Sequence, residues 1–162
     1  MTVEIRAAVL TVSDRSARGE RVDESGVVLA ELLSDAGAEV VVKEVVSDEF
    51  GPLVEKLRAL AGREGVNLVV TTGGTGLSPR DNTPEATRAV VEREVPGMAE
   101  AMRAESLRKT PTAMLSRGVC GVCSGALVVN LPGSPKGVRE CFEVIRPVLA
   151  HAVSVIAGGS HE

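Results

Sequence analysis

Residues 68–87 read as a buried strand, a glycine-rich turn, a carboxylate and the start of a helix. The run is Leu-Val-Val-Thr-Thr-Gly-Gly-Thr-Gly-Leu-Ser-Pro-Arg-Asp-Asn-Thr-Pro-Glu-Ala-Thr. A strand that feeds a helix through glycines is how α/β proteins present backbone N–H groups to an anion. An acidic side chain beside such an anion site is electrostatically unfavourable unless a metal cation lies between them. The run therefore indicates phosphate-ester chemistry with a divalent ion.

Strand-like and helix-like segments alternate along the whole chain. The apolar spacing predicts strands at residues 5–12, 39–46, 66–72, 115–123 and 126–131, and helices near 28–36, 53–61, 84–90, 96–108 and 138–156. Thr83 is the expected N-cap of the third helix, and Ser124-Gly125 the expected turn of a hairpin. This order predicts a three-layer α/β/α fold whose mostly parallel sheet carries a short antiparallel hairpin. Residues 1–158 are expected to form one domain, followed by a short polar tail at 159–162.

The composition argues against several classes of protein. The chain has 162 residues, a net charge of −4 and only two aromatic residues, Phe50 and Phe142. Nucleic-acid-binding proteins use basic patches and aromatic stacking platforms, and this chain has neither signal. No apolar run approaches the roughly 18 residues that a membrane span needs, and the N-terminus does not resemble a signal peptide. We therefore expect a soluble globular protein without nucleic-acid or membrane partners.

The three cysteines, Cys120, Cys123 and Cys141, are an odd number and few for the length. A reduced, cytoplasmic setting is therefore expected. The Cys120–Cys123 pair falls in the expected hairpin, whereas a redox pair normally opens a helix, and a structural zinc ion needs four ligands. We interpret the pair as small core or surface residues.

The glycine turn, residues 73–76 (Gly-Gly-Thr-Gly), directly follows the strand at 66–72. Its glycines permit positive φ and close approach of the backbone to a ligand, and Thr75 adds a hydroxyl donor. The turn is no P-loop, because no Gly-Lys-Ser/Thr follows, and no dinucleotide fingerprint, because the spacing differs. Taken alone, it fits a tight loop before a helix as well as it fits a phosphate site.

Polar residues follow four of the expected strands, where ligands of parallel sheets bind. These strand ends are residues 13–14, 47–48, 73–81 and 130–135. Asp48 and Asp81 each have an ordinary alternative role as a turn or helix-terminus residue. Together, beside the glycine turn, they suit Mg²⁺, which binds one or two carboxylates plus substrate phosphates. We therefore expect a two-carboxylate magnesium site.

The loop Asn-Leu-Pro-Gly-Ser-Pro-Lys at residues 130–136 opens the last helix. Its prolines make a stiff turn, and Lys136 places a positive charge at a helix start, where the helix dipole disfavours it. An anionic ligand would offset that cost. The alternative is a rigid connection whose lysine points to solvent.

Four segments, in order over nearly the whole chain, resemble the Mog/MoaB molybdopterin-binding family. They are residues 71–87, Thr11-Val-Ser-Asp-Arg15, the Pro96-Gly-Met…Met102-Arg103 and Met114-Leu-Ser-Arg117 region, and Leu131-Pro-Gly-Ser-Pro135. The resemblance implies a three-layer α/β fold, a homotrimer or hexamer, and a role in molybdenum cofactor biosynthesis. The implied reaction is adenylylation of molybdopterin by Mg-ATP, which gives pyrophosphate and adenylylated molybdopterin for a molybdate-inserting protein. Arg80-Asp81-Asn-Thr-Pro84 resembles the adenylylating Mog form, and the alternative is a non-catalytic, MoaB-like pterin-binding or carrier protein.

The resemblance also assigns site residues. The family's two acidic positions correspond to Asp48 and Asp81, the expected catalytic and metal-binding residues. The expected nucleotide and phosphate contacts are Ser13, Asp14, Gly73, Gly74, Thr75 and Gly76. The expected pterin or anion contacts are Arg80, Ser116, Asn130, Pro132, Gly133, Ser134 and Lys136.

Overall fold

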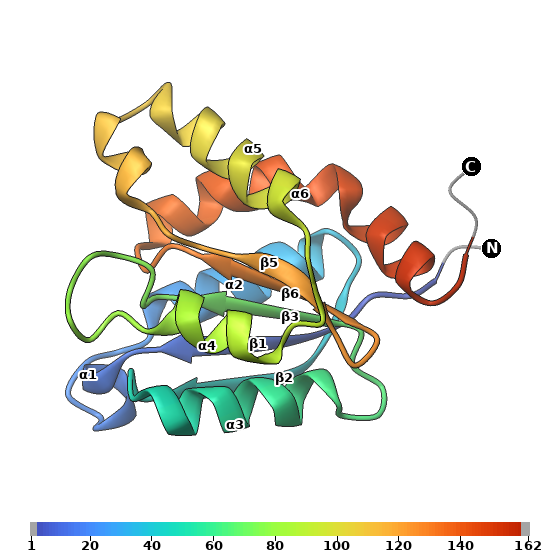
Figure 1. The fold of residues 1–162 in the computed structure, drawn as a ribbon, viewed down its shortest axis with the longest axis horizontal. Helices are drawn as coiled ribbons and strands as arrows, with labels where there is room; N and C mark the ends of the chain where they lie inside the picture. The colour runs from blue at the N-terminus through green and yellow to red at the C-terminus, as the bar shows by residue number, and fades with distance from the viewer. Residues whose placement is uncertain (1–2, 160–162) are drawn as a thin grey trace.

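A computed structural model describes residues 3–159 (Figure 1). The elements are β1 (Arg6–Val12), α1 (Asp14–Ala17), α2 (Glu24–Asp35), β2 (Glu39–Val46), α3 (Phe50–Ala61), β3 (Leu68–Thr72), α4 (Thr83–Val90), β4 (Arg93–Glu94), α5 (Pro96–Leu107), the 3₁₀ helix η1 (Pro111–Leu115), β5 (Cys120–Cys123), β6 (Ala126–Leu131) and α6 (Pro135–Ile156). Within residues 3–159, none of the helices has the length and apolar character to cross a membrane. The predicted tail at 159–162 lies outside the described residues except for Gly159.

The strands form one six-stranded sheet in the order β2-β1-β3-β6-β5-β4. β2, β1, β3 and β6 are parallel, while β5 runs antiparallel to β6 and to β4. The expected mostly parallel sheet with an antiparallel hairpin is therefore confirmed. The two-residue strand β4 was not predicted, because so short a segment has no detectable periodicity.

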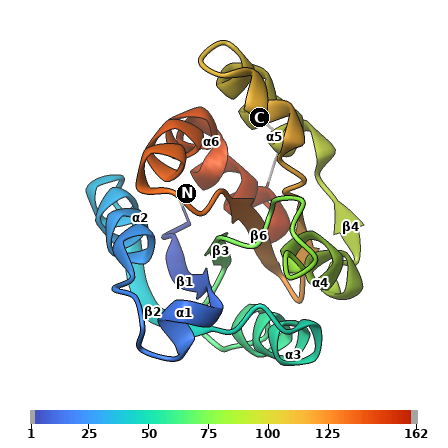
Figure 2. The same cartoon turned by 90° about the vertical axis from the view of Figure 1, so that its left-hand side faces the viewer.

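Helices cover both faces of the sheet, and the period-two alternation of strand side chains assigns each residue to one face. In β1, Ala7 and Val9 pack in the core under α2, α5 and α6, whereas Ala8 and Leu10 pack in the core over α3 and α4. Figure 2 shows these two helical layers on opposite sides of the sheet. This is the predicted α/β/α arrangement, and both faces are buried because near-continuous apolar strands leave no polar face for water.

Two local predictions were wrong. Residues 115–119 do not extend the hairpin, because Pro111–Leu115 forms η1 and the Asn130 side chain accepts the Val119 N–H at 3.0 Å, which ends the ladder there. Thr83 is not the N-cap of α4. Asn82 holds that position, and the Thr83 hydroxyl donates instead to the Gly73 carbonyl at 2.9 Å.

The carboxyl ends of the parallel strands lie side by side at one edge of the sheet. The register pairs Val12 with Val46, and Thr72 with both Thr11 and Leu131. The residues that follow these strands therefore meet at that edge, which is the edge where parallel sheets bind ligands.

Candidate functional site

The glycine turn has a backbone that only glycine adopts easily. Gly73 and Gly74 have φ angles of 100° and 71°, in the region that disfavours side chains. A Cβ atom at Gly73 would collide with the Val12 carbonyl, and one at Gly74 would collide with the Thr83 hydroxyl. The turn is therefore packed tightly between β1 and the first turn of α4.

A buried network of polar side chains supports the turn from below. The Asn130 amide donates to the hydroxyls of Thr71 and Thr87, both at 3.0 Å, and the Thr87 hydroxyl donates to the Thr83 carbonyl at 2.8 Å. These groups are essentially inaccessible to water, so each needs its partner. Asn130 was predicted as a pterin or anion contact, but its amide hydrogens are committed to this network.

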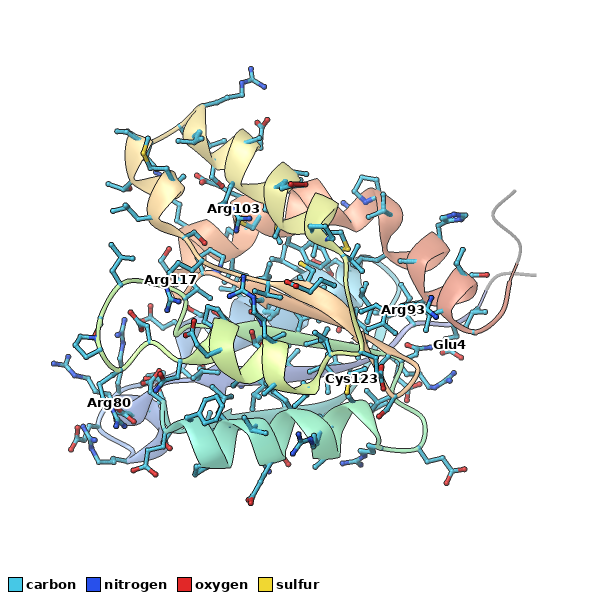
Figure 3. The ribbon with its side chains drawn as sticks, viewed as in Figure 1. Glu4, Arg80, Arg93, Arg103, Arg117 and Cys123 are labelled. Atoms are coloured by element: carbon cyan, nitrogen blue, oxygen red, sulfur yellow. The ribbon has the colours of Figure 1, made fainter. Side chains whose placement is uncertain are left out.

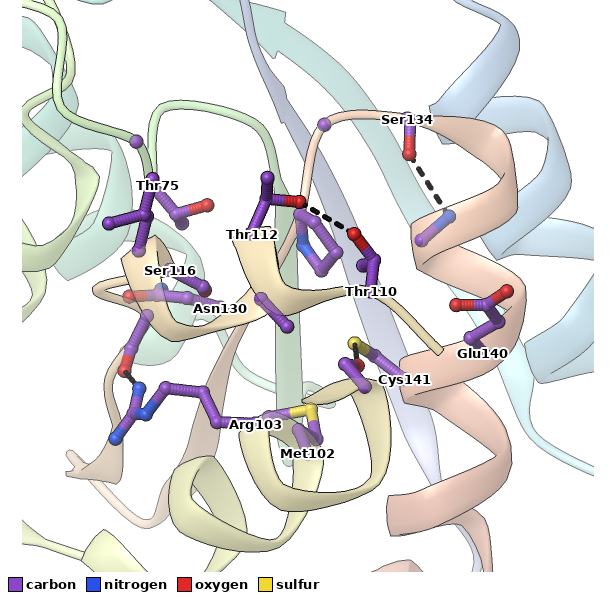
Figure 4. A pocket seen from close by; sticks show the side chains of 18 of the residues that line it. Thr75, Met102, Arg103, Thr110, Thr112, Ser116, Asn130, Ser134, Glu140 and Cys141 are labelled. Atoms are coloured by element: carbon purple, nitrogen blue, oxygen red, sulfur yellow. Dashed lines mark hydrogen bonds between the residues drawn. The ribbon is translucent and has the colours of Figure 1, made fainter. Parts of the chain in front are cut away.

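The turn forms one wall of a cavity of about 530 Å³ (Figure 4). Its lining includes the predicted site residues Gly74, Thr75, Gly76, Asp81, Ser116, Asn130, Pro132, Gly133, Ser134 and Lys136. The predicted phosphate turn and the predicted pterin loop therefore share one cavity. The Lys136 side chain is 86% exposed, and its Nζ lies 4.0 Å from Glu140, which also lines the cavity.

The remaining predicted residues lie on the other side of the glycine turn, near α1. The backbone N–H of Asp14 donates to Asp48 Oδ2 at 2.9 Å, and the backbone N–H of Asp48 donates to Asp14 Oδ1 at 3.0 Å. Arg80 binds both oxygens of Asp14, at 2.9 and 2.8 Å. Ser13 caps α1 through its hydroxyl, which accepts from the Ser16 N–H. A smaller pocket of about 120 Å³ lies beside Ser13 and Gly73.

The pKa values of Asp14 and Asp48 are shifted in opposite directions. The Arg80 guanidinium lowers the pKa of Asp14 below its ordinary value of 3.8. Burial raises the pKa of Asp48, and the nearby negative charges of Asp14 and Asp81 raise it further. The surroundings of Asp48 thus disfavour its charged form, and a bound cation would favour it.

The Asp48 and Asp81 carboxylates both face the glycine turn. Asp48 Oδ1 lies 3.3 Å from the place that a Gly74 Cβ would occupy, and Asp81 Oδ2 lies 2.9 Å from the corresponding Gly76 position. Within residues 3–159, no three or more His, Cys, Asp or Glu side chains are grouped to hold a metal ion. Two carboxylates beside a phosphate-sized turn are a donor set that fits Mg²⁺, whose remaining ligands are waters and substrate phosphates.

Arg117 was not predicted, yet it holds the glycine turn from outside. Its backbone N–H donates to the Thr75 carbonyl at 3.0 Å, and its guanidinium donates to the Gly76 and Asp81 carbonyls. Figure 3 shows Arg80 near α1 and Arg117 towards α5, at the same edge of the molecule. Sequence reasoning passed over it because no periodicity shows which distant carbonyls an arginine reaches.

The far wall of the cavity includes Met102-Arg103, a segment that carries the family resemblance but to which the sequence assigned no site role. It is formed by α5 and η1, whose contributions include Met102, Arg103, Ser106, Thr110 and Thr112. The Arg103 guanidinium donates to the Gly118 carbonyl at 3.0 Å, and the Ser106 hydroxyl lies 3.7 Å from the Cys141 sulfur (Figure 4). All three cysteines are buried and free, and burial raises the pKa of Cys120 to about 12, as expected for small core residues.

Residues 8–151 match the family described as "Probable molybdopterin binding domain". The chain belongs to the molybdopterin-binding domain family. Its fold also matches the crystal structure of the molybdopterin biosynthesis enzyme MoaB from Thermus thermophilus, at 52% identity and a TM-score of 0.89, with 98% of this chain and 99% of that chain covered. The Mog protein structure from Mycobacterium ulcerans gives 44% identity and a TM-score of 0.87, with 95% and 99% covered.

Relatives with assigned functions in the family differ in length. The molybdopterin adenylyltransferase of Helicobacter pylori is 41% identical over 156 residues, which span 95% of this chain and 89% of that protein. The cofactor synthesis protein cinnamon of Drosophila melanogaster is 42% identical, but the match spans only 26% of its length. The resemblance to the Mog/MoaB family, and the fold that it implied, are thus confirmed.

Proposed function

We propose that this member of the molybdopterin-binding domain family is a molybdopterin adenylyltransferase of molybdenum cofactor biosynthesis. It transfers the adenylyl group of Mg-ATP to molybdopterin and releases pyrophosphate. The observation that carries the proposal is the position of Asp48 and Asp81 against the glycine turn, which forms a wall of a 530 Å³ cavity. The name of the H. pylori relative supports the same reaction.

The proposed reaction requires no covalent intermediate with the protein. An oxygen of the terminal phosphate of molybdopterin forms a bond to the α-phosphorus of ATP, and the bond from that phosphorus to the oxygen bridging to the β-phosphorus breaks. Pyrophosphate leaves with that bridging oxygen. The protein must hold two phosphate groups in line and offset their charges, which is the main source of rate enhancement in such reactions.

Different residues bind the phosphates, the magnesium ion and molybdopterin. The N–H groups of Gly74, Thr75 and Gly76 and the Thr75 hydroxyl bind phosphate oxygens, whereas the Gly73 N–H already donates to the Leu131 carbonyl. Ser13 and Asp14 lie beyond the turn, on the nucleotide side. Asp48 and Asp81 hold Mg²⁺ or its water shell, and the ion supplies positive charge to the phosphates. The loop at 132–136 and Ser116 line the cavity and bind molybdopterin there. Arg80 lies across the turn beside Asp14, where its remaining donors face an anionic group on the nucleotide side.

The proposed function also includes the assembly of the protein, its cellular setting and the protein that receives its product. Residues 1–158 act as one molybdopterin-binding domain in a cytoplasmic homotrimer or hexamer, and the product passes to a molybdate-inserting protein. Analytical ultracentrifugation of the purified chain measures the assembly, and a monomeric sedimentation coefficient would contradict it.

The second candidate is a non-catalytic, MoaB-like pterin-binding protein, because a cavity that holds molybdopterin serves a carrier as well as an enzyme. One assay separates the two functions. The protein is incubated with molybdopterin and Mg-ATP, and adenylylated molybdopterin and pyrophosphate are measured. The transferase forms both products, whereas a carrier binds molybdopterin and forms neither.

A further inference from the structure

Arg117 donates hydrogen bonds to three carbonyl groups of the segment that contains the glycine turn. Its backbone N–H binds the Thr75 oxygen at 3.0 Å, Nε binds the Gly76 oxygen at 2.8 Å, and Nη2 binds the Asp81 oxygen at 2.9 Å. The guanidinium thus joins the two ends of the 76–81 loop. Its Nη1 atom also forms an ion pair with Glu85, in the first turn of α4.

Hydrogen bonds that fix these carbonyls also fix the direction of the N–H group in each of the same peptide groups. In a planar trans peptide the C=O and N–H bonds point in opposite directions. The N–H groups of Gly76, Leu77 and Asn82 therefore point away from Arg117. Within residues 3–159, none of these three N–H groups donates a hydrogen bond to the protein.

The three N–H groups lie at or next to the cavity. Gly76 lines it, and Leu77 and Asn82 each follow a lining residue, Gly76 and Asp81, whereas the Arg117 side chain is not part of the lining. Backbone N–H groups that lack a protein acceptor bind water in the free protein and are open to a phosphate oxygen. In these three peptide groups the carbonyl thus faces Arg117, and the N–H faces the opposite side.

We infer that Arg117 is a positioning residue, which orients the N–H groups of Gly76, Leu77 and Asn82 towards the phosphates of the nucleotide. This inference rests on the proposed function, because it takes ATP as the ligand of the turn. Arg117 acts through the peptide groups and touches no reacting atom.

Arginine suits this role better than lysine. Its planar guanidinium has donors in a fixed fork and can bind Gly76, Asp81 and Glu85 together. A lysine ammonium at the same place would keep the positive charge, but it could not span the carbonyls at both ends of the loop in one geometry. Arg117→Lys keeps the positive charge and Arg117→Met removes it. Comparing the two variants therefore separates the effect of charge from the effect of hydrogen-bond alignment.

The test measures binding of a magnesium-loaded ATP analogue with a methylene bridge between the α- and β-phosphorus, by isothermal titration calorimetry. The proteins are wild type, Arg117→Lys, Arg117→Met, Arg117→Ala and the control Arg58→Met. Arg58 also donates to a carbonyl near α4, that of Ala89, but lies outside the cavity lining. Circular dichroism confirms that each variant is folded. Guanidinium ion is added to Arg117→Ala at millimolar concentration, far below the molar range that unfolds proteins.

We expect Kd to rise about tenfold or more in all three Arg117 variants, which corresponds to losing the alignment of several charge-assisted hydrogen bonds. Kd should stay within about twofold of wild type in Arg58→Met, because an exposed hydrogen bond outside the site is lost. Guanidinium should restore at least part of the affinity of Arg117→Ala, because the side chain is only one-third exposed and leaves a guanidinium-shaped space.

Binding as tight as wild type in Arg117→Lys or Arg117→Met would overturn the inference, and so would a weakened Arg117→Ala that guanidinium does not improve. A variant that does not fold is replaced in the comparison by Glu85→Gln, which should raise Kd in the same direction by loosening Arg117. If wild type itself does not bind the analogue, the proposed function fails together with this inference. The two failures are therefore distinguishable.

Discussion

Asp14 and Asp48 each accept a hydrogen bond from the backbone N–H of the other, at 3.0 and 2.9 Å. Both oxygens of Asp14 are also bound by Arg80, so Asp14 is committed to the structure of the site. Asp48 differs, because its Oδ1 atom faces Gly74 in the glycine turn. Asp14 therefore has a cationic partner in the protein, Arg80, whereas Asp48 is placed to pair with a cation that a ligand brings.

The variant Asp48→Asn should lose adenylyl transfer and keep molybdopterin binding. The asparagine oxygen can still accept the Asp14 N–H, so the loop remains in place, but the charge that holds Mg²⁺ is gone. We expect kcat to fall about 100-fold or more, as when one strong electrostatic contact to the transition state is removed. Asp35→Asn, on the exposed end of α2, is the matched control. Unimpaired turnover in Asp48→Asn would show that this carboxylate has no catalytic role.

The same variant should be more stable than wild type at neutral pH. The folded-state pKa of Asp48 is raised, so the folded protein holds that proton more tightly than the unfolded chain, and ionisation of Asp48 disfavours folding. The penalty is absent below the ordinary pKa of 3.8 and develops as pH rises through the folded-state pKa. Urea unfolding of wild type and Asp48→Asn at several pH values measures it. A variant less stable than wild type at pH 7 would disprove the burial argument.

The strand ends were predictable, because apolar runs and their polar ends are local patterns. The β3 strand and the glycine turn lie in one continuous stretch, and the parallel sheet then brings Asp48 to the same edge. What the pattern could not show was long-range hydrogen bonding. Arg117 reaches carbonyls about 40 residues away in the chain, and Arg80 pairs with Asp14 across 66 residues.

The α5–η1 wall shows a second limit of sequence reasoning. A helical face of small and polar residues, such as Ser106 and Ala99, has no signal that separates a cavity wall from a solvent-exposed surface. Asn130 shows that a residue at a ligand-binding position of the sequence can also be part of the core. It follows a ligand-binding pattern at a strand end, yet its amide joins Thr71, Thr87 and Val119 inside the core.

Gly74→Ala should destabilise the protein much more than Gly37→Ala. Both glycines have positive φ, 71° and 90°, so each substitution incurs the left-handed penalty of about 1–2 kcal/mol. A Cβ at Gly37 meets no atom within 4 Å, whereas one at Gly74 collides with the Thr83 hydroxyl. We expect an additional loss of about 1–3 kcal/mol, because the hydrogen bond from Thr83 to Gly73 must break. Urea denaturation compares the two, and equal losses would mean that the turn is not tightly packed.

Asn130→Ala should cost about 2–4 kcal/mol of unfolding free energy, because it leaves the buried Val119 N–H and the Thr71 hydroxyl without a partner and removes one of the two hydrogen bonds of the Thr87 hydroxyl. Asn67→Ala is the control. It removes a comparable bridge, from the Arg6 N–H to the Glu4 carbonyl, where water can replace the lost bonds. That variant should lose only about 1 kcal/mol. If the two variants were equally stable by thermal or urea unfolding, the network under the glycine turn would not be structurally important.

Adenylyl transfer at the glycine turn can be measured directly from its two products. Purified wild-type protein and Asp48→Asn are each incubated with molybdopterin and Mg-ATP, and the products are separated and identified by mass. We predict that wild type forms adenylylated molybdopterin and pyrophosphate in equal amounts, while Asp48→Asn binds molybdopterin and forms neither above background. Wild-type protein that binds molybdopterin but yields no adenylylated product would contradict the account.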